Sequence, residues 1–73
     1  MDAIGYAVRD RLGQIIVKTV SPTERAAKVN WMVTEADRLI TAHWTDDRIN
    51  AAFEREAEVR SAALIKVVIT EAP

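Results

Sequence analysis

The sequence predicts a small α+β domain, on the basis of three observations. Residues 4–20 read as a β-hairpin, residues 21–58 contain two helix-start signals, and residues 59–70 are rich in β-branched side chains. The element order β-β-α-α-β predicts a small three-stranded sheet with two helices packed on one face. Neither a linker nor an internal repeat divides the 73 residues, so we expect a single domain over residues 1–73.

The predicted hairpin consists of two strands and a short turn. Residues 4–9 alternate between large apolar and small or charged side chains, as a strand with one buried face does. Residues 14–20 follow as a run dense in β-branched side chains. Between the two runs, Asp10 is typical of a residue that opens a turn, and Gly13 of the left-handed position that closes it. The pattern therefore predicts two antiparallel strands joined at residues 10–13.

The first helix is predicted to begin with Ser21 as its N-cap. Pro22 suits the first helical position, and Glu24 completes a Ser-x-x-Glu capping box. At about 100° per residue, a stripe of aliphatic residues should face the core: Ala26, Val29, Val33, Ala36 and Ile40. Trp31 lies roughly opposite this stripe, among mostly polar residues. Residues 34–44 contain no glycine or proline to mark the end of the helix.

The second helix is predicted to begin with Thr45 as its N-cap and to run through residues 46–58. Asp46 and Asp47 follow the cap directly, where the helix dipole favours negative charge. The residues expected to face the core are spaced four apart: Ile49, Phe53 and Ala57.

The final predicted strand, within residues 59–70, is apolar on both of its faces. One face carries Val59, Ala63, Ile65, Val67 and Ile69, and the other carries Ala62, Leu64 and Val68. A strand of this kind either lies in the centre of a covered sheet or meets a second chain along its edge. Leu64 is therefore a candidate contact residue in a homodimer.

Composition narrows the functional classes. The chain contains no cysteine, which is typical of proteins of the reducing cytosol, and it lacks a signal-peptide pattern. The longest apolar run is far shorter than the ~20 residues that span a bilayer, so we expect a cytoplasmic protein with no membrane contact. The net charge of −1 gives no general attraction for nucleic acid.

Few residues are suited to catalysis. His43 is the only histidine, and a cluster with Asp46 and Asp47 offers too few ligands for a typical metal site. Gly5 and Gly13 are the only glycines, so the chain has no glycine-rich loop to hold a phosphate. We expect no catalytic residue, no metal ion and no cofactor.

Trp31 leads to two interpretations. Tryptophan and arginine are enriched at binding hot spots, so an exposed Trp31 bordered by Arg38, Glu35 and Lys28 predicts a protein-binding surface. The alternative is that Trp31 packs inside the domain, under residues 34–44 or against a strand. The partner would be a different protein or a second copy of the chain. A purely structural subunit would bury the same Trp31 face in a homo-oligomer.

A nucleic-acid role is the second functional candidate. Arg9, Arg11 and Lys18 all lie on the predicted hairpin, where they could contact phosphates as part of a small dimeric protein. Little positive charge accumulates there, because Asp2 and Asp10 offset part of it. We therefore consider nucleic acid the weaker candidate.

One long segment is also similar to other small proteins. The run "YAVRDRLGQIIVKTVSPTERAAKVNWMVTE", Tyr6 to Glu35, resembles a hairpin-plus-helix pattern of small uncharacterised proteins from phages and prophages. It covers less than half of the chain and brings no catalytic motif. Small phage proteins of this kind often block host machinery, including bacterial defence complexes such as CRISPR effectors. The resemblance thus implies an anti-CRISPR-like inhibitor of a host complex. Many such inhibitors imitate DNA through strong negative charge, from which this chain, at −1, departs.

Overall fold

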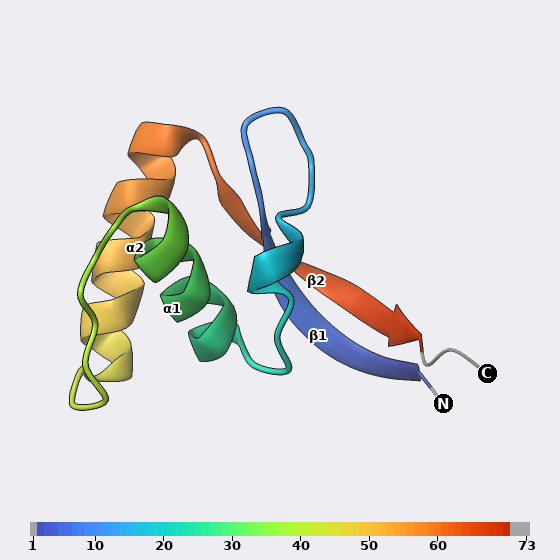
Figure 1. The fold of residues 1–73 in the computed structure, drawn as a ribbon, viewed down its shortest axis with the longest axis horizontal. Coiled ribbons are helices and arrows are strands. Elements are labelled where there is room, and N and C mark those ends of the chain that lie inside the picture. Colours follow the sequence, from blue (N-terminus) through green and yellow to red (C-terminus); the bar gives the residue numbers. More distant parts are fainter. Residues whose placement is uncertain (1, 71–73) are drawn as a thin grey trace.

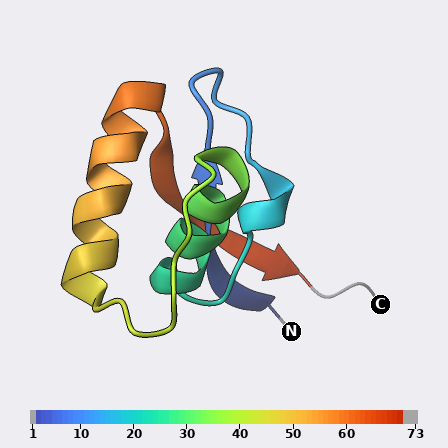
Figure 2. The same ribbon diagram turned by 60° about the vertical axis from the view of Figure 1, so that its left-hand side comes forward.

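The computed structural model describes residues 2–70, with side chains for residues 3–69. Its elements are strand β1 (Asp2–Arg9), the 3-10 helix η1 (Val17–Thr19), helices α1 (Glu24–Glu35) and α2 (Asp46–Arg60), and strand β2 (Ala63–Thr70). Figures 1 and 2 show the two strands side by side, with α1 next to them and α2 on the far side of α1. Neither α1 nor α2 is long and apolar enough to cross a membrane.

The α+β class is confirmed, but the sheet has two strands rather than the three predicted. β1 and β2 are antiparallel and pair along their whole length, from Asp2 opposite Thr70 to Arg9 opposite Ala63. The last segment of the chain therefore forms a strand, as predicted. It pairs directly with the first strand, which is its single strand neighbour within residues 2–70.

Residues 14–21, which we call the returning segment, run back beside β1 without forming the predicted second strand. They make only isolated bridges, one at each end, and η1 interrupts them in the middle. Thr19 explains the interruption, because its Oγ1 accepts a 2.8 Å hydrogen bond from the Val8 N–H and donates to the Ile16 carbonyl. A side chain thus supplies the acceptor that a backbone carbonyl supplies in a regular ladder, and the 3-10 turn is stabilised at the same time.

The predicted turn at residues 10–13 is confirmed. The Asp10 side chain accepts hydrogen bonds from the N–H groups of Leu12 and Gln14, at 2.9 and 3.0 Å. Gly13 has a φ of +80°, the left-handed conformation that only glycine adopts without strain. The turn reverses the chain even though no regular strand follows it.

Helix α1 begins later than predicted. Its N-cap is Thr23, whose side chain accepts from the Ala26 N–H at 3.1 Å. Ser21 is buried against β1 instead, where it exchanges two backbone hydrogen bonds with Tyr6. The predicted Ser21–Glu24 capping box is therefore wrong, because the pairing of Ser21 with the strand holds its backbone outside the helix.

The buried face of α1 also differs from the prediction. The residues it buries are Ala27, Trp31 and Met32, whereas Val33 on the expected stripe is exposed. Val29 and Ile40 of the predicted stripe are half-buried and pack against the core cluster. One tryptophan, however, buries roughly 150–250 Å², more than any single residue of that stripe. The area of the indole, rather than the number of aliphatic residues, determines which face turns inward.

Helix α2 follows the prediction closely. The Thr45 side chain accepts from the Arg48 N–H at 3.2 Å, and Ile49, Phe53 and Ala57 are buried. Helix α2 packs mainly against α1 rather than on the sheet, so the expectation of two helices on one sheet face is not met. Ser61 adopts a left-handed conformation with φ of 54° and turns the chain from α2 into β2.

Candidate functional site

Trp31 is a core residue, which contradicts the prediction of an exposed anchor. Only 2% of its surface is accessible, and its ring meets the ring of Phe53 edge-on, with centroids 5.3 Å apart. The core cluster around it includes Val8, Met32 and Ile49. Trp31 thus joins β1, α1 and α2, and its ring is not accessible to a partner.

The residues predicted to border Trp31 have different roles. Lys28 donates to the Asn50 side chain at 2.7 Å and lies 5.5 Å from the centre of the Phe53 ring. Arg38 donates from both Nε and Nη2 to one oxygen of Glu56, at 3.2 and 2.8 Å. Both cations therefore tie α1 and the loop after it to α2. Of the predicted group, only Glu35 is exposed.

The Glu56 carboxylate is the centre of a small ionic network. The hydrogen bond from Arg38, supported by the charges of Arg38 and Arg60, holds the pKa of Glu56 below its ordinary value. Arg60 lies one helical turn away on α2, with its Nε 3.7 Å from the carboxylate. The network links the loop between the helices, at Arg38, to α2.

Leu64, predicted to contact a second chain, is half-buried and packs against the core cluster. Its side chain lies on the same sheet face as Val8, to which it is directly paired. Much of the Leu64 side chain therefore contacts the core of its own chain, and only the remaining part could contact a second chain.

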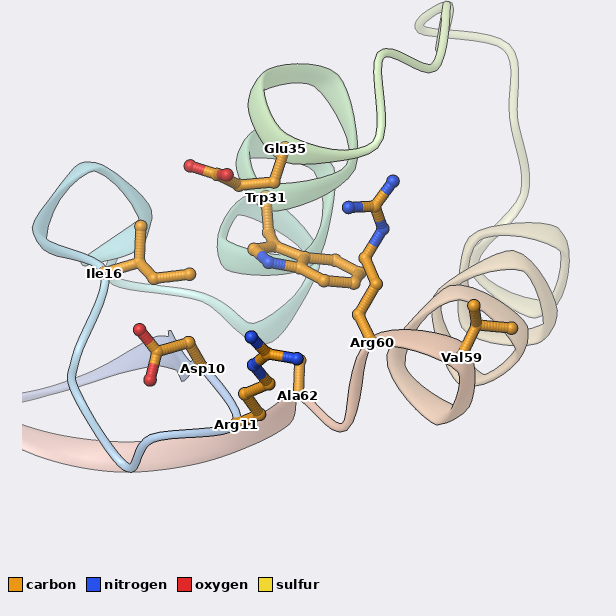
Figure 3. Close-up of a pocket in the computed structure, with 8 residues that line it drawn as sticks. All are labelled: Asp10, Arg11, Ile16, Trp31, Glu35, Val59, Arg60 and Ala62. Atoms are coloured by element: carbon orange, nitrogen blue, oxygen red, sulfur yellow. The ribbon is translucent and has the colours of Figure 1, made fainter.

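A hollow of about 370 Å³ opens above Trp31. Figure 3 shows the indole at its floor, with Arg11 and Asp10 contributed by the turn after β1 and Arg60 by the end of α2. Glu35 completes a rim of two basic and two acidic groups, and the other lining residues are Ile16, Val59 and Ala62. Because the rim charges balance and the walls are apolar, the hollow suits an uncharged side chain better than a small ion.

Residues 9–20, which include Asp10, Arg11 and Ile16 of this hollow, combine exposed aliphatic and basic side chains, and we call them the loop surface. Its most exposed aliphatic residues are Leu12 and Val17, with 74% and 79% of their surface accessible. Ile15 and Val20 are exposed to a lesser degree. Figures 1 and 2 show the turn after β1 projecting at one end of the molecule, while η1 lies beside the strands at the level of α1. So many exposed aliphatic residues on one segment are unusual for an isolated small domain.

The three predicted nucleic-acid residues belong to the same surface. Arg9 lies at the end of β1 and pairs with Ile15, Arg11 lies in the turn beside Leu12, and Lys18 lies in η1. All three are exposed. The fold thus gathers the basic residues on one segment and interleaves them with aliphatic ones.

The exposure of Leu12 and Val17 was not predicted from the sequence. The predicted strand would have turned alternate residues of the segment toward a core, and its β-branched composition supported that expectation. The signal that could have revealed the exposure was the pair of basic residues, Arg11 and Lys18, directly beside them. Flanking charges of this kind are typical of a segment that remains in water.

We searched for a metal site among the described residues and for similar known proteins. Within residues 2–70, no three histidine, cysteine, aspartate or glutamate side chains are close enough together to hold a metal ion. No protein-family model, curated protein or solved structure matches the chain.

Proposed function

We propose that the protein is a small non-enzymatic protein-binding module whose loop surface takes an acidic, amphipathic segment of a partner protein. The observation that carries this proposal is the interleaving of exposed Leu12, Ile15 and Val17 with Arg9, Arg11 and Lys18. Aliphatic side chains supply the apolar area of an interface, and the cations select a partner of opposite charge. The hollow beneath the loop offers a place for one apolar side chain of that partner.

The alternative, a nucleic-acid-binding protein that uses Arg9, Arg11 and Lys18, is less well supported. Single strands bind through exposed aromatic rings, but the four aromatic residues of the chain are buried or half-buried: Tyr6, Trp31, Trp44 and Phe53. Phosphate contacts would also leave the aliphatic residues of the loop surface without a role. A protein segment uses both kinds of side chain.

The narrower proposal is that the partner belongs to a host complex, such as a bacterial defence complex. It rests on the resemblance of residues 6–35 to small phage proteins, and on nothing else in the molecule. The modest net charge of −1 favours shape and apolar contact over DNA imitation as the means of inhibition.

The proposal is tested by capturing partners from a nuclease-treated bacterial extract with three immobilised proteins. These are the wild type, a Leu12→Ser/Val17→Ser variant, and a Val33→Ser/Leu39→Ser variant that changes two exposed aliphatic residues outside the loop surface. We expect one protein to bind the wild type and the control variant but not the loop variant, and to survive a wash in high salt.

Two results would reject the proposal. Equal capture by the wild type and the loop variant would mean that Leu12 and Val17 do not contact the partner. Binding that requires intact nucleic acid and falls steeply with salt would favour the alternative, since release of counterions makes phosphate binding strongly salt-dependent.

A further inference from the structure

The outer edge of β2 carries unpaired backbone groups. Tyr6 and Val8 direct their N–H and C=O groups away from β2, toward the returning segment. Because these directions alternate along a strand, Gly5 and Ala7 bond to β2, through Val67 and Ile65. The backbone groups between these positions on β2, at Leu64, Lys66 and Val68, must then point outward. Within the described part of the chain, no hydrogen bond reaches them.

We infer that this edge pairs with β2 of a second copy of the chain, in antiparallel register about a two-fold axis at Val67. The dimer then contains a four-stranded sheet in the order β1-β2-β2-β1, in which the last two strands belong to the second copy. The loop surface lies on the other side of β1, so this pairing is independent of the proposed function. An open edge of eight residues without proline is a template for strand pairing.

The register follows from the sequence of the strand. A two-fold axis perpendicular to the sheet places each residue and its copy on the same face. In an antiparallel pair this requires that one residue lies on the axis and pairs with its own copy. Pairing about Val67 overlaps residues 64–70 and bonds Lys66 to Val68 of the second copy. Pairing about Lys66 overlaps as many residues but places the two ammonium groups directly opposite each other, which is unfavourable.

The same register makes an apolar row across the axis. Ile65 meets Ile69 of the second copy, and Val67 meets Val67, at positions that carry no hydrogen bonds and whose side chains are therefore closest. These residues are half-buried in the single chain, on the sheet face opposite Leu64. The face of β2 that carries Ile65, Val67 and Ile69 is thus symmetric about Val67, which makes a second copy the fitting occupant.

The charge of the chain is compatible with self-association. A net charge of −1 per chain produces little repulsion between copies.

The register is tested by cross-linking, since the chain has no cysteine of its own. Two Val67→Cys chains would bring their thiols together at the axis, within the 4.4–6.8 Å between Cα atoms that a disulfide spans. Two Lys66→Cys chains would not, because residue 66 faces Val68. We expect Val67→Cys to form a disulfide dimer under mild oxidation many times faster than Lys66→Cys, or than Val33→Cys on the exposed side of α1.

Light scattering over a dilution series completes the test, with thermal melts to show that each variant is folded. We expect the wild type to have the mass of two chains, and Val67→Lys and Val67→Asp to have the mass of one, because like charges meet at the axis. A mixture of these two variants should restore the dimer. A monomeric wild type, or cross-linking of Val67→Cys no faster than that of Val33→Cys, would overturn the inference. A dimer in which Lys66→Cys reacts fastest would overturn the register.

Discussion

At the scale of single residues, Trp31 contributes most to the core. It contacts Phe53 on α2 edge-on and belongs to the same buried cluster as Val8 on β1 and Met32 beside it on α1. A domain of this size buries only ~60% of the surface that its unfolded chain exposes. One large side chain shared by three elements is therefore an economical way to hold them together.

Trp31→Ala should destabilise the domain by about 3–5 kcal/mol, because it removes a buried aromatic side chain and leaves a cavity. So large a loss is a substantial part of the stability of a small domain, and we expect most of the variant to be unfolded at 25 °C. Val33→Ala, on the exposed side of the same helix, is the matched control and should have little effect. Chemical denaturation measures both, and a stable, folded Trp31→Ala would show that Trp31 is not a core residue.

Thr19 is the second residue with a clear energetic role. It is fully buried, and its hydroxyl both accepts from the Val8 N–H and donates to the Ile16 carbonyl. Thr19→Val keeps the shape but leaves the Val8 N–H without a partner, which should cost about 1–3 kcal/mol. Thr19→Ser keeps the hydroxyl and should cost less. A larger loss for Thr19→Ser than for Thr19→Val in urea denaturation would mean that the methyl group, rather than the hydrogen bonds, matters.

At the scale of elements, the ends of the helices determine how they connect. Helix α2 ends at Ser61, which has a φ of 54°, and the Ala62 N–H donates back to the Ala57 carbonyl at 2.9 Å. The left-handed conformation at this position costs little free energy when the residue is glycine and more when the residue has a Cβ. Ser61 is exposed and makes no side-chain hydrogen bond within the described residues, so its side chain contributes little else.

Ser61→Gly should therefore raise the midpoint of thermal unfolding, by an amount that corresponds to roughly 0.5–1 kcal/mol. Ser61→Ala keeps the Cβ and should give no such gain. A lower midpoint for Ser61→Gly than for Ser61→Ala would contradict the left-handed turn between α2 and β2.

The link between the helices should depend on pH. Hydrogen bonding to Arg38 lowers the pKa of Glu56 in the folded state, so the ionised form stabilises the fold. This contribution is complete above the pKa of an unfolded glutamate, ~4.3, and is lost as the pH falls through the lower pKa of the folded state. The stability advantage of the wild type over Glu56→Gln should thus be greatest near neutral pH and shrink in acid.

Denaturation at a series of pH values measures this advantage. Glu58→Gln, at an exposed position of the same helix, is the control and should follow the wild type. An advantage over Glu56→Gln that stays constant down to strongly acid pH would show that Arg38 does not favour the ionised carboxylate.

Local signals in the sequence predicted the elements, while the contacts between them were harder to predict. The turn at Asp10 and Gly13 and the cap at Thr45 depend on neighbouring residues alone, and both are confirmed. The position of Ser21 depends on its pairing with Tyr6, fifteen residues earlier, which no local pattern reveals. The orientation of α1 depends on the area of Trp31 rather than on the periodicity of its aliphatic residues.

The same limit applied to the candidate site. The basic residues Arg9, Arg11 and Lys18 could be identified from the sequence, because charge is a property of each residue. Whether Leu12 and Val17 are buried depended on whether the returning segment completes a strand, and Thr19 determines that by replacing one ladder bond with a side-chain bond. The exposure of Leu12 and Val17 thus depends on contacts of the returning segment that no local pattern reveals.

At the scale of the whole molecule, the domain is a flat body with principal extents of 37, 30 and 17 Å. The sheet has the returning segment on one side of β1 and an open edge on the far side of β2. The two surfaces are thus separated by the width of the sheet, which would let a dimer formed through β2 present two loop surfaces at its ends. A bivalent arrangement of this kind increases the apparent affinity for a partner that has two matching sites.

The central claim is that β2 has one paired and one open edge within a single chain. Amide hydrogen exchange, resolved by residue in the Val67→Lys variant that we expect to be monomeric, tests it most directly. We predict alternating protection along β2, with slow exchange at Ile65 and Ile69, which face β1, and fast exchange at Leu64, Lys66 and Val68. In the wild-type dimer, Lys66 and Val68 should become slow as well. Slow exchange at every residue from 64 to 69 in the monomeric variant would contradict the account, because β2 would then lie between two strands of its own chain.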